Sequence, residues 1–284
     1  MRTTFAKYIV PALLLGTCSS IASADEGWAF HGFGDISIKN DYVTPRGLVV
    51  TTAGTTVQVL NGLVAVAPGG VAFHAGTWVD MNPGYSRAHG NITAVNEFDY
   101  FFGVDYDILP KLNVGAEYSE FISGQPSVAF KNEHNLEFSV KYKDGSPDKP
   151  YSINPYAKLF WAFSSRSSTV VLGKAGKTFD IELGAVPTYK TGMLTLSAPT
   201  WITVGPKTYW GVAAPDGNVG VFSTGLKASV PVPFKPGGAG MSVYAFGQYY
   251  NLINDNLVTA KALLNGGANK RSHFQFGGGI SFGF

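Results

Sequence analysis

The feature that most limits the fold of this chain is an alternation of apolar and polar residues with a period of two, which continues from Trp28 to Phe284. Alternating segments of about ten residues are separated by breaks rich in Gly, Pro, Asn and Asp. Over 274–284, for example, aromatic and aliphatic residues occupy most alternate positions, and small or polar residues occupy the positions between them. This period is that of a β-strand with one apolar and one polar face, so the sequence predicts an all-β fold.

The breaks divide the chain into about twelve strands. We predict them near residues 28–40, 54–66, 71–80, 96–106, 112–121, 132–142, 151–163, 177–189, 193–204, 221–231, 241–252 and 271–284. Ten or fourteen strands are the alternatives. Segment 241–252 has no clean apolar face, and proline, which cannot donate a ladder hydrogen bond, lies within or beside predicted strands at Pro155, Pro187, Pro199 and Pro231.

Composition and connection lengths favour a closed barrel over a soluble sandwich. Charged residues make up only 14% of the chain and aromatic residues another 14%, and the aromatic side chains recur on the apolar faces. An even number of alternating strands joined by short and long connections in turn is typical of outer-membrane barrels. We therefore predict a closed antiparallel transmembrane β-barrel with both chain ends at the side of the short turns. The short breaks lie at 67–70, 108–111 and 190–192, and the long ones at 81–95, 164–176, 205–220 and 253–270.

The first 24 residues have the order of a secretory signal. Arg2 and Lys7 precede an apolar run over 8–16, and Ala22-Ser23-Ala24 precedes an acidic pair. We expect Sec export, cleavage near Ala24 and a single barrel domain over 25–284. A lipoprotein anchored through Cys18 is the alternative, although Thr17 is a poor residue before a lipidated cysteine. Without Arg2 and Lys7, basic and acidic residues are equal in number, and no long Lys/Arg run predicts a nucleic-acid partner.

Ionisable residues on the polar strand faces are the candidates for a pore lining. Asp99, Glu117 and Glu137 come from three successive predicted strands and would form an acidic stripe that attracts cations. Internal salt bridges, with Lys141 or Lys158 against Glu137, are the competing interpretation. The predicted pore-lining set is Asp99, Glu117, Glu137, Lys141, Lys158, Glu97, Asp105, Asp180 and Glu182.

Two further features concern the width and entrance of the pore. Asp41 and Arg46 lie in the first loop, between the predicted strands near 28–40 and 54–66, where a pair between them would hold the loop. Glycines on the polar faces, such as Gly103 and Gly279, would either widen the lumen or ease strand bending. The expected function is passive diffusion of small hydrophilic solutes or ions with a weak cation preference. A non-conducting barrel with a plugged lumen is the alternative.

The sequence predicts no catalytic residues, metal or cofactor. Ser272 adjoins His273, and His134 adjoins Asn135, but neighbours on a strand point to opposite faces and cannot act together. An outer-membrane lipid hydrolase is therefore the less favoured alternative.

Two segments resemble known outer-membrane proteins. The end of the chain, with Phe276, Ile280, Phe282 and Phe284 at alternate positions, is similar to the signal read by the barrel-assembly machinery. Residues 34–47, with Asp41-Tyr42 followed by Arg46-Gly47, resemble the opening of the TorF-family porins. Further similarities lie at 75–80, 97–103 and 197–201, although the spacing between Asp41-Tyr42 and Arg46-Gly47 is one residue longer than in the family. The TorF-family resemblance implies a barrel of about twelve strands with a pore function but no defined substrate, and it implies that Arg46 lines an entrance. The expected partners are outer-membrane lipids, the assembly machinery and small solutes.

Overall fold

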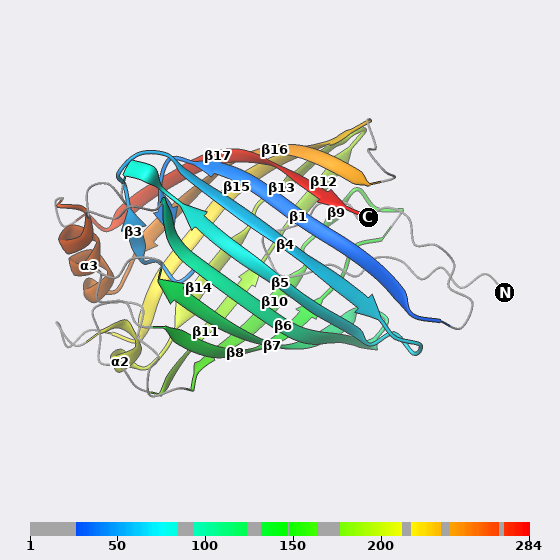
Figure 1. Ribbon diagram of the computed structural model, residues 1–284, viewed down its shortest axis with the longest axis horizontal. Coiled ribbons are helices and arrows are strands. Elements are labelled where there is room, and N and C mark those ends of the chain that lie inside the picture. The colour runs from blue at the N-terminus through cyan, green and yellow to red at the C-terminus, as the bar shows by residue number, and fades with distance from the viewer. Residues whose placement is uncertain are drawn as a thin grey trace.

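The fold is a single closed barrel of antiparallel strands in the computed structural model (Figure 1). The structure describes residues 27–84, 94–123, 132–146, 148–163, 177–211, 217–233, 239–266 and 270–284. The predicted signal peptide, residues 1–24, lies outside the described residues. None of the described helices is long and apolar enough to cross a membrane.

Nine of the barrel strands are continuous, and three are each built from two shorter segments. The continuous strands are β1 (Ala29–Lys39), β4 (Thr56–Val66), β5 (Ala72–Met81), β6 (Val95–Leu109), β7 (Leu112–Ser123), β8 (Glu133–Tyr142), β15 (Val219–Val232), β16 (Gly240–Leu252) and β17 (Ser272–Gly283). The composite strands are β9 (Tyr151–Ser152) with β10 (Pro155–Ala162), β11 (Thr178–Ala185) with β12 (Thr188–Thr191), and β13 (Leu194–Ser197) with β14 (Thr200–Val204).

Strand pairing closes these elements into a ring. Each strand pairs antiparallel with its neighbours in the chain, β1 pairs with β17, and the link between β14 and β15 completes the circle. The ring has twelve strands, which confirms the predicted fold and strand number and rules out the alternatives of ten and fourteen.

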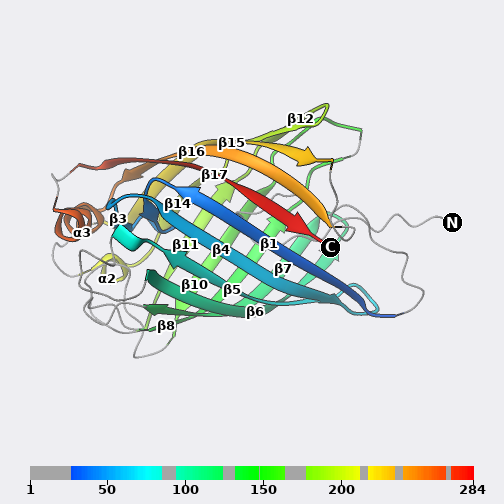
Figure 2. The same ribbon diagram turned by 45° about the horizontal axis from the view of Figure 1, so that its top comes forward.

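Short and long connections lie at opposite ends of the barrel. The short turns share one end with the chain terminus, where Gly32 N–H donates to the Phe284 carbonyl at 2.7 Å. We call this the turn end. The opposite end, the loop end, carries the hairpin of β2 (Tyr42–Val43) and β3 (Val49–Thr51) and the helices α2 (Lys207–Trp210) and α3 (Asp255–Asn265) (Figures 1 and 2).

Three of the four prolines that interrupted the predicted strands mark the breaks of the composite strands. Pro155 follows the break between β9 and β10, Pro187 lies between β11 and β12, and Pro199 lies between β13 and β14. Asn154 has a positive φ of 50° at the first break, a conformation that Asn tolerates better than most residues. Pro231 instead lies inside continuous β15. The three breaks are neighbours in the wall, because Ala185 pairs with both Pro155 and Thr200.

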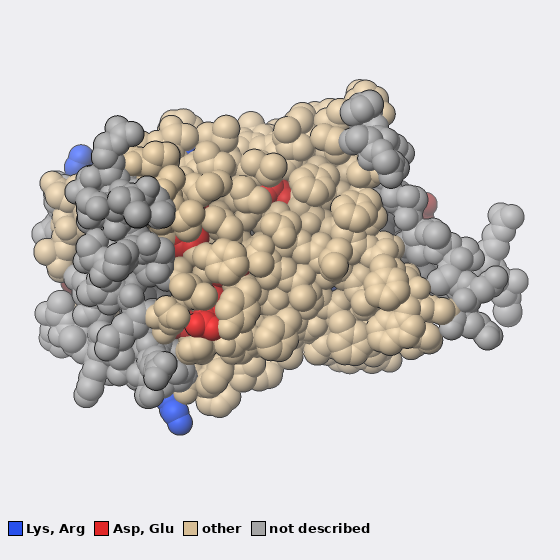
Figure 3. Space-filling model, viewed as in Figure 1, with Lys and Arg blue, Asp and Glu red and all other residues tan. Residues whose placement is uncertain are grey.

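The outer wall is apolar. Phe30, Leu63, Phe102 and Phe276 are exposed, and the barrel wall seen in Figure 3 is almost free of Lys and Arg and shows only a few Asp and Glu side chains. The alternation therefore has the predicted orientation, with apolar side chains outward and polar ones inward. The residues of the predicted assembly signal lie on this wall. Phe276, Ile280 and Phe284 are exposed, and the ring of Phe282 covers Gly34.

Inward glycines lie beneath large side chains of neighbouring strands. The two roles predicted for them, a wider lumen and easier strand bending, did not include this arrangement. A Cβ at Gly103 would meet His74, and one at Gly279 would meet the phenol of Tyr244. The same relation joins Gly62 to Phe33, Gly76 to Phe101, Gly184 to Tyr156 and Gly225 to Gln248. These glycines accommodate side chains that lie flat on the inner wall, so they do not leave free space in the lumen.

Candidate functional site: the lumen

The predicted pore-lining residues all point into the barrel. Glu97, Asp99 and Asp105 come from β6, Glu117 from β7, Glu137 and Lys141 from β8, Lys158 from β10, and Asp180 and Glu182 from β11. They occupy the strand positions that alternate with the exposed apolar side chains, and they contact one another across strands.

An ion-pair network covers one side of the lumen toward the turn end. His74 lies between Asp105, at 3.1 Å, and Glu117, at 2.9 Å. Lys141 Nζ lies 3.3 Å from the same Asp105, and the network continues through Lys143 to Asp107 at 2.9 Å and Lys158 to Glu137 at 3.0 Å. We call these residues the turn-end network. Of the two pairs predicted for Glu137, the one with Lys158 forms, whereas Lys141 contacts Asp105 instead.

An apolar cluster adjoins the turn-end network, because the Phe101 ring lies 6.3 Å from the ring of His74. Phe33 and Phe101 are buried inside the barrel and pack with Leu60 and Val64. The ion pairs and the apolar cluster are therefore neighbours on the inner wall.

An apolar core fills the lumen at the loop end. The connection between β1 and β4 folds inward, and its β2–β3 hairpin packs against side chains from β14–β16, α2 and α3. We call this set the loop-end core. It consists of Tyr42, Val43, Leu48, Val49, Val50, Trp201, Tyr209, Trp210, Val221, Tyr250, Leu252, Leu257, Val258 and Ala260.

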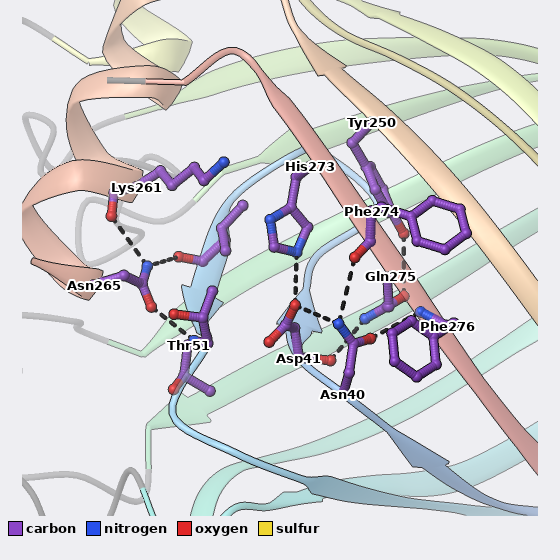
Figure 4. Close-up of polar contacts among 12 residues, drawn as sticks. Asn40, Asp41, Thr51, Tyr250, Lys261, Asn265, His273, Phe274, Gln275 and Phe276 are labelled. Atoms are coloured by element: carbon purple, nitrogen blue, oxygen red, sulfur yellow. Dashed lines mark hydrogen bonds and ion pairs between the residues drawn. The ribbon is translucent and has the colours of Figure 1, made fainter. Parts of the chain in front are cut away.

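The hairpin is also held by polar contacts (Figure 4). Asp41 Oδ2 lies 3.0 Å from His273 Nε2, and the Asp41 carbonyl accepts a hydrogen bond from Gln275 at 2.8 Å. Asn265 of α3 donates to the Val49 carbonyl at 3.0 Å and accepts from the Thr52 N–H at 2.7 Å. The hairpin is thus fixed to β17 on one side and to α3 on the other.

The predicted pair between Asp41 and Arg46 is wrong. Arg46 instead extends toward the lumen wall, where its Nη1 lies 3.8 Å from Glu133 Oε1, and Asp41 pairs with His273. The two residues have separate charged partners on the barrel, and for this reason they do not pair within the loop.

Arg46 is deeply enclosed. Its guanidinium lies 5.0 Å from the centres of both the Phe121 and the Phe160 ring. Burial would lower the pKa of Arg46, but the surrounding electronegative groups, including Tyr209, Glu133 and Asp180, outweigh it and raise the pKa above its ordinary value. The guanidinium is therefore a permanent positive charge in the lumen.

The three residues of the predicted acidic stripe belong to two groups. Glu117 and Glu137 are directly opposite each other on β7 and β8, and each has a basic partner in the turn-end network. Asp99 lies nearer the loop end, in register with Phe121 and within the electrostatic range of Arg46.

Sequence reasoning missed the inward apolar residues. Phe101, Phe121 and Phe160 occupy polar-face positions, and an aromatic ring at such a position indicates packing inside the barrel. Leu48-Val49-Val50 and Tyr209-Trp210 lie in long connections. Apolar runs in connections that would otherwise face water are the signal that could have revealed the loop-end core.

The two adjacent pairs considered for an enzyme, Ser272 with His273 and His134 with Asn135, point to opposite faces of their strands as expected. His273 is buried in the lumen and Ser272 is exposed, while Asn135 is buried and His134 is only partly covered. Among the described residues, no group of three His, Cys, Asp or Glu side chains could hold a metal ion.

Comparisons with known proteins find barrels of low similarity. No family model matches the chain, and no curated protein matches it, so the TorF-family resemblance remains a prediction. A bacterial polysaccharide outer membrane secretin is 9% identical with a TM-score of 0.44, covering 90% of this chain and 97% of its own. OmpF of Salmonella typhi in complex with daunomycin is 11% identical with a TM-score of 0.38, covering 90% and 97%. A further porin is 12% identical with a TM-score of 0.35, covering 90% and 100%.

Proposed function

We propose that the protein is an outer-membrane channel for passive diffusion of small hydrophilic solutes or ions, with a weak cation preference. The observation that carries the proposal is the lumen wall, where acidic side chains outnumber basic ones inside a closed barrel with an apolar exterior. Acidic wall residues include Asp99, Asp105, Glu117, Glu137 and Glu182, and the basic ones are fewer, among them Lys39, Lys141, Lys158 and Lys227. Such a wall favours the entry of cations.

The location follows from the same features. A closed barrel leaves no strand edge unpaired, and an apolar exterior can lie in lipid. We propose export by the Sec route with cleavage near Ala24, and insertion by the barrel-assembly machinery, which would read the C-terminal residues Phe276, Ile280, Phe282 and Phe284.

A second candidate function is a non-conducting structural or binding barrel. The loop-end core favours it, because Val49, Trp210 and Leu252 are fully buried where the core fills the loop end of the described lumen. In the channel hypothesis, the β2–β3 hairpin has to move aside for solutes to pass.

Single-channel conductance of the refolded mature protein in a planar bilayer tests these alternatives. We expect discrete conductance steps and a reversal potential of cation-selective sign under a salt gradient. The triple variant Asp99→Asn, Glu117→Gln and Glu137→Gln should shift the reversal potential toward zero. Silence from a demonstrably folded barrel would favour the non-conducting alternative, and an unchanged reversal potential in the triple variant would refute the role of these acids.

A further inference from the structure

Two aromatic rings enclose the Arg46 side chain. Phe121 extends from β7 and Phe160 from β10, and the centre of each ring is 5.0 Å from the guanidinium carbon. This distance lies within the range in which a ring face attracts a cation, and a planar guanidinium also stacks on such faces. The two rings therefore form a slot for a flat cation.

Each ring is flanked by two carboxylates on neighbouring strands. In the strand register, Phe121 lies opposite Asp99 on one side and Glu133 on the other. Phe160 lies opposite Glu137 and Asp180 in the same way. The repeated arrangement, a ring between two acids, surrounds the slot with negative charge from β6, β8 and β11. Glu137 is already paired with Lys158, which leaves Asp99, Glu133 and Asp180 for a cation in the slot.

Several buried polar atoms at this place lack a direct hydrogen-bond partner within the described part of the chain. They are both carboxylate oxygens of Asp180, one oxygen each of Asp99 and Glu133, both amide atoms of Asn135, and the hydroxyl of Tyr209, which faces Asp180. Asp180 is 0% exposed and Asn135 is 1% exposed. Buried polar groups are nearly always paired, and Arg46 Nη1 is itself without a hydrogen bond. Arg46 thus supplies charge to the slot but leaves acceptors unsatisfied.

Arg46 reaches the slot from a segment that is not part of the barrel wall. The preceding Pro45 carbonyl accepts a hydrogen bond from Trp201 Nε1 at 2.9 Å, and Gly47, with φ of 90°, approaches Val221 too closely for a Cβ. The hairpin therefore brings one cationic side chain to a site whose aromatic rings and carboxylates belong to the wall. A tethered group of this kind competes with any free ligand through its high local concentration.

We infer that the slot between Phe121 and Phe160 is a binding site for small organic cations of the guanidinium type, which Arg46 occupies as a tethered substitute. This inference rests on the proposed channel function and names its class of solute. A free cation with several N–H groups would satisfy the acceptors of Asp99, Glu133 and Asp180 when the hairpin moves aside.

The test uses the refolded mature barrel in detergent and the variant Arg46→Ala, with methylguanidinium chloride as the probe. The thermal unfolding midpoint of Arg46→Ala should rise by about 3 °C once the probe is tenfold above its Kd. The wild-type protein should respond less, because Arg46 fills the slot. Sodium chloride at equal ionic strength and urea at equal concentration are the controls for charge and for planar shape.

A second substitution locates the effect. Arg46→Ala combined with Asp180→Asn should lose most of the response to methylguanidinium, whereas Arg46→Ala combined with Lys143→Met, remote from the slot, should keep it. Equal responses in the wild type and Arg46→Ala, or a response that sodium chloride reproduces, would overturn the inference. If Arg46→Ala does not fold, Arg46→Gln keeps a polar side chain of similar length and the same expectations apply.

Conductance separates this inference from the proposed function. Binding of methylguanidinium to a folded barrel that shows no conductance would uphold the site and refute the channel. Conductance steps without a specific response of Arg46→Ala would uphold the channel and refute the site.

Discussion

The loop end and the turn end of the lumen are filled in different ways. At the loop end, the β2–β3 hairpin and the two helices bury aliphatic and aromatic side chains in a core like that of a soluble domain. At the turn end, the wall itself supplies the contents, mainly ion pairs among β5, β6, β7, β8 and β10. Inward polar side chains of neighbouring strands can pair with one another along the wall. The opening at the loop end, in contrast, is filled by residues of the connecting segments.

This difference leads to a contrast in stability between the ends. The hydrophobic contribution at the loop end scales with buried apolar area, and each large side chain there contributes about 1.5–3 kcal/mol. The effect of an ion pair at the turn end on the free energy of unfolding depends on how far its two side chains are shielded from water.

Trp210→Ala should have the largest effect. Trp210 is fully buried, packs edge-on against Tyr209 with ring centres 4.7 Å apart, and covers Gly220. Its truncation should lower the free energy of unfolding by about 3–5 kcal/mol. Trp161→Ala is the matched control, because Trp161 points outward and is 41% exposed. Unfolding measured by the heat-induced mobility shift on gels would show the difference, and equal losses for both variants would contradict a loop-end core.

Lys158→Met compares a buried ion pair with an accessible one. The Lys158 side chain is 7% exposed and its removal leaves the carboxylate of Glu137 without its partner, which should cost about 3 kcal/mol. Lys143→Met removes the partner of Asp107, but the Lys143 side chain is 33% exposed and the expected loss is about 0.5 kcal/mol. Urea titration of both variants measures their free energies of unfolding and checks that Lys158→Met has the larger loss. A smaller loss for Lys158→Met would mean that water reaches that pair.

Asp144→Asn should have the smallest effect, and one that depends on pH. Partial burial would raise the pKa of Asp144, but the N–H groups of Asn154 and Ile153 outweigh it and lower the pKa below its ordinary value. A lowered pKa stabilises the fold above the unfolded-state value and loses this contribution as pH falls through the folded-state value. The variant should therefore be less stable at neutral pH, by about 0.5 kcal/mol, and this difference should disappear as the pH falls through the lowered pKa of Asp144. A difference that persists at low pH would contradict this account.

The strand pattern was predictable because it depends on a local rule. The alternation over 96–106 and 274–284 gave the correct inward and outward faces, since a strand in a closed barrel has lipid-facing and lumen-facing positions in strict turn. The predicted segments 151–163, 177–189 and 193–204 end within two residues of the observed composite strands. The breaks at their prolines were not predictable from one segment alone, because they depend on how the neighbouring strands pair.

The contents of the lumen were less predictable because they depend on distant partners. Arg46 contacts residues of β7, β8 and β10, and its partner Glu133 is 87 positions away in the chain, a separation that no local pattern encodes. Asp41 is the acidic residue nearest to Arg46 in the sequence, and the prediction relied on that proximity. The two side chains point in different directions, Asp41 to His273 and Arg46 to Glu133.

The line of breaks at Pro155, Pro187 and Pro199 gives the cylinder an uneven stiffness. Each proline lacks an N–H, and separate bonds replace the continuous ladder there, such as Ala198 N–H to the Pro187 carbonyl at 2.8 Å and Val186 N–H to the Ile153 carbonyl at 3.0 Å. The opposite wall, from β17 through β1 to β6, has continuous ladders. Bending of the wall is therefore resisted least along the line of prolines, where the backbone hydrogen-bond ladder is interrupted in three adjacent strands.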